Sequence, residues 1–591
     1  MSSTVALVLT GAEVALVLAL SIRLLRKTKY AHAPRVAPPT ASDHLLALLL
    51  GALLTGLCFY SPQLAFVACG GLSAFLWLVW LDVALYRSFS FELGLGGVRD
   101  VVLSNLVSEV IHMRCARQFL LSHRDFLLLP VLIPLSLLTL FLAPLSALRV
   151  VIEGSLLVFF AGTLFRREDH IEQTPSLSIS KTRRALFHNF VRPRRPQIAA
   201  NFVARPEHAA LLSPQLLPQK QSPQHGLLSG RSVVLLTFES LGQTHLTEGA
   251  AKTPFLSSLA GCPHTLSSRL HVSLAPLTNV AHHALYFGQH TLRGTLPAVP
   301  HLGQLSQLGY QSIYLTAVNT AHYGLARILQ QAGFDHICDG PQLLALQTGR
   351  NDQATDELLV SAGMTKLAQL LSARPFFLHV HAGNAHLPYH VDDQEKFHRH
   401  DMQDDRGRFL NAIEETDALF HTLWQSIEEL VRRLSDATCP PLLILSSDHG
   451  QSFGEHFYQS HGSAVTAEQT LVPLLFHHPL LSAQTVAQST HFDVIPTVLD
   501  LLGLPSKPSH GSSLLSDSRP AHHLLWDGQP SRNTSGCLGL LIGDSKYSLD
   551  LIRDTLIQSD WQDQNPRVLD GAERSYFESL IGLFAKQSGV L

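Results

Sequence analysis

The stretch that decides the fold is PLLILSSDHGQSFGEHFYQSHG, residues 441–462. It opens on a short apolar run, residues 441–447, of the kind that forms a buried strand. Polar residues follow at once, with an aspartate beside a histidine and two more histidines further along. Ser, Gly, Asp and His are also common in ordinary surface turns. The choice between a turn and a functional site therefore depends on whether other strands end in the same way.

From about residue 231 onward, short apolar runs alternate with segments of helical periodicity. Four further runs are buried-strand candidates: SVVLLTF at 232–238, SIYLTA at 312–317, FFLHVHA at 376–382 and VPLLFHH at 472–478. Helix-like segments lie between them, at 301–309, 354–373 and 409–436. Strands that alternate with helices predict an α/β domain around a largely parallel sheet.

In such sheets, functional groups lie just beyond the carboxyl ends of the strands. Polar candidates follow three of the predicted strands: Glu239 and Ser240, then His381, His386 and His390, then Asp448 and His449. A fourth stretch, SLAPLTNVAHHALYFG at 273–288, places the hydroxyl of Thr278 in a loop before a predicted helix. Carboxylates, imidazoles and a hydroxyl at one sheet edge can bind one or two metal ions and activate an oxygen nucleophile.

The first 165 residues are strongly apolar and predict an α-helical transmembrane region of about five spans. Four stretches carry these spans, the second being long enough for two helices: residues 5–22, 44–86, 126–143 and 147–165. Basic residues follow the first stretch, an order that favours a membrane anchor over a cleaved signal peptide. Core helices of a soluble protein are the alternative, but so many apolar runs exceed what a soluble core needs.

The remaining segments complete the predicted domain organisation. Residues 87–125 mix charged and apolar residues and favour an interfacial amphipathic helix. Residues 166–230 are polar and rich in Pro, Gln and Arg, which indicates a linker along the membrane surface. The α/β domain then spans 231–591. A net charge of -3 carries no electrostatic signature of nucleic-acid binding, so that class of function is not favoured.

Taken together, these segments resemble the membrane-anchored phosphoethanolamine and phosphoglycerol transferases of the alkaline phosphatase and sulfatase superfamily. Lipid A phosphoethanolamine transferases and lipoteichoic acid synthases belong to this group. The resemblance rests on motifs in family order: VVLLTFESLGQTH, TPFLSSLA, the Thr278 loop, LGYQSIYLTA, AGFDHICD, RPFFLHVHAGNAHLPY, and SSDHGQSFGEH through EQTLVPLLF. It implies an alkaline phosphatase-like α/β/α sandwich with a largely parallel central sheet.

The resemblance also implies roles for individual residues. Four residues match the ligands of the catalytic metal, with Thr278 also the nucleophile: Glu239, Thr278, Asp448 and His449. His386 and His461 match histidines that contact the transferred phosphate group or a second metal. Other nearby histidines are expected to be structural or to support the ligands: His282, His283, His381 and His390. Zn²⁺ suits the mixed ligand set, with Mn²⁺ the alternative because oxygen ligands dominate.

The implied reaction is transfer of phosphoethanolamine from a phospholipid, expected to be phosphatidylethanolamine, to a hydroxyl or phosphate of a cell-envelope glycan or glycolipid. It would pass through a phospho-threonine intermediate. Phosphoglycerol transfer of the lipoteichoic acid synthase type is the alternative. A sulfatase-like hydrolase is a further one, although LTNVAHH at 277–283 lacks the Pro and Arg of the sulfatase signature. A non-catalytic membrane sensor would not need all four ligand positions.

Family membership would place the protein in the bacterial inner membrane as a multi-pass protein, with the catalytic domain on the periplasmic or extracellular side. The basic residues at 23–35 and after 165 favour the opposite orientation by the positive-inside rule. Of seven cysteines, four lie in the predicted catalytic domain and permit two disulfides: Cys262, Cys338, Cys439 and Cys537.

Overall fold

The computed structural model describes residues 205–208 and 219–590. Short internal gaps interrupt the second range, at 248–249, 290–301, 322–323, 347–353, 373, 388, 435–439, 463, 518, 521, 528–536, 551–554 and 589. The chain divides into two units, 1–194 with 457–459, and 195–456 with 460–591. The predicted membrane spans, the segment at 87–125 and most of the linker lie outside the described residues. No described helix is both long and apolar enough to cross a membrane.

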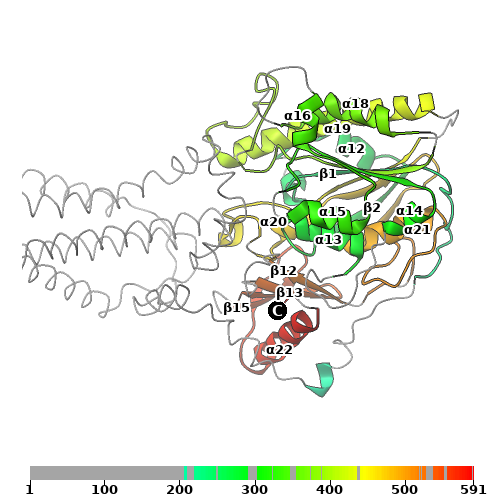
Figure 1. Ribbon diagram of the computed structural model, residues 1–591. Helices are drawn as coiled ribbons and strands as arrows, with labels where there is room; N and C mark the ends of the chain where they lie inside the picture. The colour runs from blue at the N-terminus through cyan, green and yellow to red at the C-terminus, as the bar shows by residue number, and fades with distance from the viewer. Residues whose placement is uncertain are drawn as a thin grey trace, which may run out of the picture. The chain divides into compact units, whose positions relative to one another are not determined.

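A mixed nine-stranded sheet forms the centre of the second unit (Figure 1). Its strands are β1 (Val233–Phe238), β2 (Thr265–Val272), β3 (Gln311–Thr316), β4 (His336–Cys338), β5 (Phe376–His381), β6 (Leu442–Ser447), β9 (Leu471–Val472), β10 (Leu474–His477) and β11 (Gln484–Thr490). The strand order is β11-β2-β10-β6-β1-β5-β3-β4, with β9 paired to β2. Neighbours from β6 to β4 run parallel, whereas β10 runs antiparallel to β6 and β2. The predicted α/β class and largely parallel sheet are confirmed.

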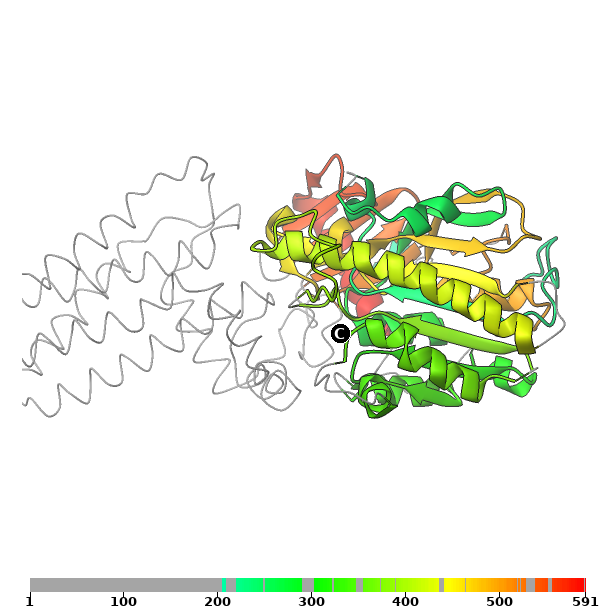
Figure 2. The ribbon, with the colours of Figure 1, turned by 90° about the horizontal axis from the view of Figure 1, so that it is seen from above.

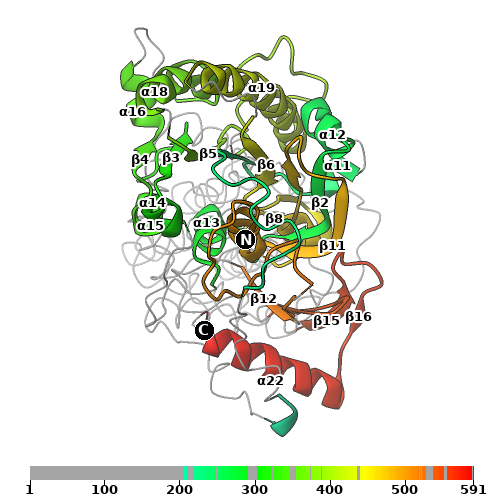
Figure 3. The same ribbon diagram turned by 90° about the vertical axis from the view of Figure 1, so that its right-hand side faces the viewer.

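Helices cover both faces of this sheet (Figures 1 and 3). One face is covered by α12 (Pro254–Ala260), α16 (Gly340–Leu346), α17 (Glu357–Val360), α18 (Ala362–Leu370) and α19 (Asp405–Leu434). The other is covered by α13 (Thr278–Phe287), α14 (Gly303–Gln307), α15 (Leu325–Ala332) and α21 (Val494–Leu501). The helix predicted at 354–373 is two helices, since the chain bends at Ser361 between α17 and α18.

Short elements complete the described chain. They are η2 (Pro206–His208), α11 (Thr244–Thr247), β7 (Ser452–Phe453), η4 (Glu455–Phe457), β8 (Gln459–Ser460), α20 (Ala467–Thr470) and η5 (His491–Asp493).

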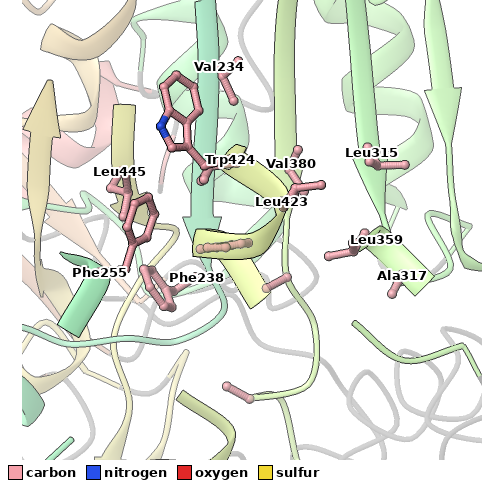
Figure 4. Close-up of a cluster of buried hydrophobic side chains, with 14 of the residues drawn as sticks. Val234, Phe238, Phe255, Leu315, Ala317, Leu359, Val380, Leu423, Trp424 and Leu445 are labelled. Atoms are coloured by element: carbon pink, nitrogen blue, oxygen red, sulfur yellow. The ribbon is translucent and has the colours of Figure 1, made fainter. Parts of the chain in front are cut away.

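The central strands are apolar on both sides because helices bury both sides. Successive side chains of a strand point to opposite faces. On β1, Val234 and Phe238 therefore enter the core under α19, whereas Leu235 enters the core under α13. Figure 4 shows the first of these cores, with Trp424 of α19 beside the sheet. The continuous apolar runs in the sequence follow directly from this double burial.

A second, antiparallel sheet follows the nine-stranded sheet in the chain and was not predicted. It comprises β12 (His522–Trp526), β13 (Cys537–Ile542), β14 (Ser545–Asp550), β15 (Thr555–Asp560) and β16 (Arg567–Val568), paired in chain order. The final helix, α22 (Gly571–Gln587), packs on it. Ala275 and Val280 share the same hydrophobic cluster. The small sheet therefore supports the loop that carries Thr278.

The cysteines do not form the two disulfides that the sequence permits. Cys262, Cys338 and Cys537 are free thiols. Cys439 lies outside the described residues. No disulfide therefore forms among the described cysteines, a question that the sequence left open.

The long yellow-green helix in Figure 2 is α19. Buried carboxylates on this helix hold neighbouring segments of the chain. The Asp417 carboxylate accepts the backbone N–H groups of Phe255 and Leu256, at 2.9 and 3.0 Å. These N–H groups lie in the first turn of α12 and have no partner within their own helix. Asp417 thus caps α12 from another part of the chain.

We expect Asp417→Ala to lower the free energy of unfolding by about 2–4 kcal/mol, because two buried N–H groups lose their acceptor. Denaturant unfolding of the purified chain measures this loss. Thr422→Ala on the exposed face of the same helix is the control, with an expected change below about 0.5 kcal/mol. Equal losses in the two variants would contradict the capping role.

Candidate metal centre

Three predicted ligands meet at the carboxyl ends of two neighbouring parallel strands. The register pairs Phe238 of β1 with Ser447 of β6. The next residues, Glu239 and Asp448, therefore leave the sheet side by side, and His449 follows. Ligand atoms of Glu239, Asp448 and His449 all lie within 4.8 Å of one another, and the three side chains are buried.

Hydrogen bonds from Ser240 hold one oxygen of each carboxylate in place. The Ser240 N–H donates to Asp448 Oδ1 at 2.9 Å, and its hydroxyl donates to Glu239 Oε1 at 2.5 Å. Ser240 adopts a left-handed backbone conformation, with φ of 61°. Such a conformation is strained for a residue with a side chain and is tolerated where a site requires it. Asp448 Oδ2 is buried and accepts no hydrogen bond.

Thr278 lies at the same place because it is the first residue of α13. Its Oγ1 is 3.3 Å from His449 Nε2. The N-terminus of a helix carries partial positive charge from its unpaired N–H groups. A negative charge that develops on the Thr278 oxygen is therefore stabilised by the start of this helix.

His386 and His461 also lie beside these residues. The ring centroid of His461 is 4.4 Å from that of His449 and 5.5 Å from that of His386. His461 Nδ1 lies 2.8 Å from Gln451 Oε1. Because an amide oxygen only accepts, the His461 Nδ1–H donates to it, and burial lowers the pKa of this ring well below its usual value. The neutral His461 thus keeps a lone pair on Nε2.

The electrostatics of the site favour a cation. Burial alone would raise the pKa of Glu239, but the hydrogen bond to His381 and the charges of His449 and His386 hold it well below its usual value. Burial and the neighbouring Glu239 raise the pKa of Asp448. Neither carboxylate forms an ion pair with a lysine or arginine among the described residues. A divalent cation fits this buried pair and the unpaired Asp448 Oδ2.

The structure shows where the other predicted histidines lie. His282 Nδ1 is 2.7 Å from the Thr278 carbonyl oxygen, the His283 ring stacks on Phe287, and His390 Nε2 is 3.1 Å from Asp392. His381 is the exception, because its Nε2 lies 3.3 Å from Glu239 Oε2. The sequence interpretation gave His381 no more weight than its neighbours. The signal available was its position near the carboxyl end of a predicted strand, at 376–382.

A second cluster of side chains that could bind a metal ion lies outside the centre at Glu239. It consists of His456, Glu468 and Asp563. Lys546 pairs with Asp563 and also donates to the Val465 carbonyl oxygen at 3.1 Å. Because a lysine already supplies positive charge to this group, a cation is less suited to it than to the centre at Glu239.

The chain carries a domain of a known family. Residues 231–504 match the family model described as Sulfatase, and they are a sulfatase domain of the superfamily that the ordered motifs indicate. A curated 2,3-bisphosphoglycerate-independent phosphoglycerate mutase from Desulforudis audaxviator (strain MP104C) is 32% identical over 118 residues. That match covers 20% of this chain and 22% of the mutase, so the chain spans about a fifth of the relative's length.

Several solved structures are similar to this chain. The lipoteichoic acid synthase LtaP from Listeria monocytogenes is 14% identical, with a TM-score of 0.46, over 65% of this chain and 97% of that one. A protein in the alkaline phosphatase superfamily from Vibrio parahaemolyticus is 16% identical, with a TM-score of 0.49, over 67% and 93%. The phosphonate monoester hydrolase of Agrobacterium radiobacter is 14% identical, with a TM-score of 0.45, over 60% and 96%.

We expect Asp448→Asn and His449→Ala each to reduce the bound metal to below about a tenth of the wild-type content, because each removes a charged or imidazole ligand. Elemental analysis of the purified protein measures the content. Replacing the exposed His398 by alanine is the control and should leave the metal content unchanged. Wild-type metal content in both site variants would show that the centre lies elsewhere.

Proposed function

We propose that this protein is a metal-dependent phosphotransferase. It moves phosphoethanolamine from a phospholipid to a hydroxyl or phosphate of a cell-envelope glycan or glycolipid. The observation that carries this proposal is the position of the Thr278 hydroxyl, 3.3 Å from His449 Nε2 at the start of α13 and beside two buried carboxylates. A hydroxyl in such a place is suited to act as a nucleophile.

The identity of residue 278 favours phosphoryl transfer over sulfate-ester hydrolysis. Sulfatases of this superfamily act through a formylglycine aldehyde, which is made from cysteine or serine. A threonine cannot be converted to that aldehyde, because its side-chain carbon already carries a methyl group. The chain also lacks the Pro and Arg of the sulfatase signature after this position. A hydroxyl nucleophile is therefore the better interpretation of Thr278.

The proposed metal ligands are Glu239, Thr278, Asp448 and His449, with Zn²⁺ as the ion and Mn²⁺ as the alternative. When bound, such an ion supplies Lewis-acid stabilisation of negative charge on oxygen. The start of α13 adds the partial positive charge of its N–H groups at Thr278. The His461 ring lies beside His449 and the His386 ring lies beside His461, which supports a role for both in contacting the transferred phosphoryl group.

The covalent steps balance without a further reactant. The Thr278 oxygen attacks the phosphorus of the donor lipid, the bond to the diacylglycerol oxygen breaks, and diacylglycerol leaves with the threonine proton. Phosphoethanolamine then remains on Thr278. An acceptor oxygen attacks the same phosphorus, and Thr278 regains its hydroxyl proton as the acceptor loses its own. Each displacement breaks one phosphate ester bond and forms another, so the transfer needs no separate energy source.

Phosphatidylethanolamine is the proposed donor, and phosphatidylglycerol is the alternative. The apolar first 165 residues support a lipid substrate, because about five spans would hold the domain at a bilayer surface. On the same grounds we propose that the protein lies in the bacterial inner membrane, with its catalytic domain on the periplasmic or extracellular side.

We expect Thr278→Ala to reduce transfer by about 10³-fold or more, because it removes the nucleophilic oxygen. Head-group transfer from phospholipid in detergent measures the rate. Thr278→Ser retains a hydroxyl and should keep measurable activity, which separates loss of the nucleophile from loss of the fold. Wild-type turnover by the alanine variant would refute the assignment.

The donor is tested by offering the detergent-solubilised protein each phospholipid with a labelled head group and no acceptor. Phosphatidylethanolamine should label the chain at Thr278 and release diacylglycerol, as mass spectrometry of the peptide would show. The Thr278→Ala variant should remain unlabelled with either lipid. Labelling from phosphatidylglycerol alone would instead identify a phosphoglycerol transferase.

A further inference from the structure

Five buried side chains form a continuous series of polar contacts that ends on Glu239. Tyr286 comes from α13, His379 and His381 come from β5, Thr237 comes from β1, and Glu239 directly follows β1. None of these side chains is more than 2% exposed. We call Tyr286, His379, Thr237 and His381 the relay.

The relay lies on a face of the sheet that is otherwise apolar. Side chains two residues apart on a strand share a face, so Leu235 lies on the side of Thr237, and Phe377 lies on the side of His379. Both of these apolar residues belong to the core under α13. The register sets Thr237 directly opposite His381. The two strands thus change from apolar to polar side chains as they approach the metal centre.

The distances define a connected path. The Tyr286 hydroxyl contacts His379 Nδ1. His379 Nε2 lies 2.8 Å from Thr237 Oγ1, which lies 3.0 Å from His381 Nδ1. His381 Nε2 lies 3.3 Å from Glu239 Oε2 and has no other polar partner. Every ring nitrogen of both histidines is therefore accounted for by the relay and Glu239.

When both rings are neutral and the Thr237 hydroxyl donates to one of them, the protons of the relay run in one of two directions, because each hydroxyl and each neutral imidazole has one proton to donate. The other acceptor near the Thr237 hydroxyl is the Val380 carbonyl oxygen, at 3.5 Å, the outer limit of a hydrogen bond. Burial raises the pKa of Tyr286 and lowers that of His379, so the phenol stays protonated and the His379 ring stays neutral. Burial also acts to lower the pKa of His381, but the hydrogen bond to Glu239 and the neighbouring carboxylates raise it above its usual value, which favours a proton on Nε2. In one direction the His381 Nε2–H faces the Glu239 carboxylate. In the other direction a nitrogen lone pair would face that carboxylate at 3.3 Å, which is repulsive.

The favoured direction can be followed bond by bond. The Tyr286 O–H donates to His379 Nδ1, and the His379 Nε2–H donates to Thr237 Oγ1. The Thr237 hydroxyl then donates to His381 Nδ1. Because His381 Nδ1 accepts this hydrogen bond, the proton of His381 lies on Nε2, toward Glu239.

We infer that the relay fixes the tautomer and orientation of His381 and, through it, the position of the Glu239 carboxylate at the metal centre. Thr237, His379 and Tyr286 are positioning residues in this scheme, since none of them touches a predicted ligand directly. The inference rests on the proposed role of Glu239 as a metal ligand. Outer partners of this kind orient metal ligands and change metal affinity by about 10–100-fold when removed.

Stability alone does not account for the relay. Burying a polar group costs free energy unless it is hydrogen-bonded, and apolar residues of similar shape at the same positions would be about as stable. The relay instead holds one specific arrangement of protons beside a carboxylate. A fixed arrangement of protons orients a metal-ligand carboxylate, whereas the packing of the sheet does not need it.

Thr237→Val tests the inference, because it removes the hydroxyl and keeps the shape of the side chain. In the full-length protein we expect Zn²⁺ affinity, measured by chelator competition, to fall about 10–100-fold. The visible absorption of the Co²⁺-loaded protein should also change, because it reports ligand geometry. Thr237→Ser restores the hydroxyl and should stay within about threefold of wild type on the same scale.

Thr265→Val is the matched control. It removes another buried threonine hydroxyl, which donates to the Leu259 carbonyl oxygen at 2.7 Å and lies 3.2 Å from His477 Nδ1. This threonine has no contact with the relay, so Zn²⁺ affinity and the Co²⁺ spectrum should match wild type. A loss equal to that of Thr237→Val would mean that any buried hydroxyl has this effect, which overturns the inference.

Tyr286→Phe tests the inference if Thr237→Val fails to fold, because it removes only the hydroxyl at the start of the relay. It should weaken Zn²⁺ binding about 3–10-fold, less than Thr237→Val, because Tyr286 lies further from Glu239 along the relay. Wild-type affinity and an unchanged Co²⁺ spectrum in this variant would overturn the inference. A wild-type protein that binds Zn²⁺ but transfers no phosphoethanolamine would refute the proposed function only, since metal affinity still tests the relay.

Discussion

The site depends on the burial of two carboxylates, Glu239 and Asp448, at the ends of adjacent strands. Like charges in a low-dielectric interior repel strongly, and each also loses its hydration. Neighbouring groups stabilise the two carboxylates and offset this cost. They are the N–H and hydroxyl of Ser240, the ring of His381 and the ring of His449. These groups leave Asp448 Oδ2 without a hydrogen bond, with His449 Nε2 at 3.3 Å, and a divalent cation fits at that oxygen.

The sheet makes this arrangement possible. Parallel strands β5, β1 and β6 end at one edge, so residues far apart in the chain leave the sheet beside one another. The helix α13 then begins at the same edge with Thr278, whose preceding loop packs with the C-terminal antiparallel sheet through Ala275. Rigid strands place the carboxylates and a separate packed layer places the hydroxyl. Precise sites are commonly built on such supports.

The relay shows how one core serves two purposes. The layer between the sheet and α13 is apolar at Leu235 and Phe377, where it stabilises the fold by excluding water. Over the last residues of the same strands it becomes a row of hydrogen-bonded rings and hydroxyls. In the proposed scheme, these buried groups orient Glu239 from the core side of the metal centre.

The sequence by itself determined the α/β class and the polar residues that directly follow the strands. Those features follow from local patterns: apolar runs that must be buried and polar residues after them. The resemblance to a known family, and not a local pattern, selected Glu239, Thr278, Asp448 and His449 as a set. Only the tertiary structure decided that His381 faces Glu239, that the helix predicted at 354–373 is two, and that the free cysteines do not pair. Each of these depends on distances between residues remote in the chain, and no local pattern encodes such distances.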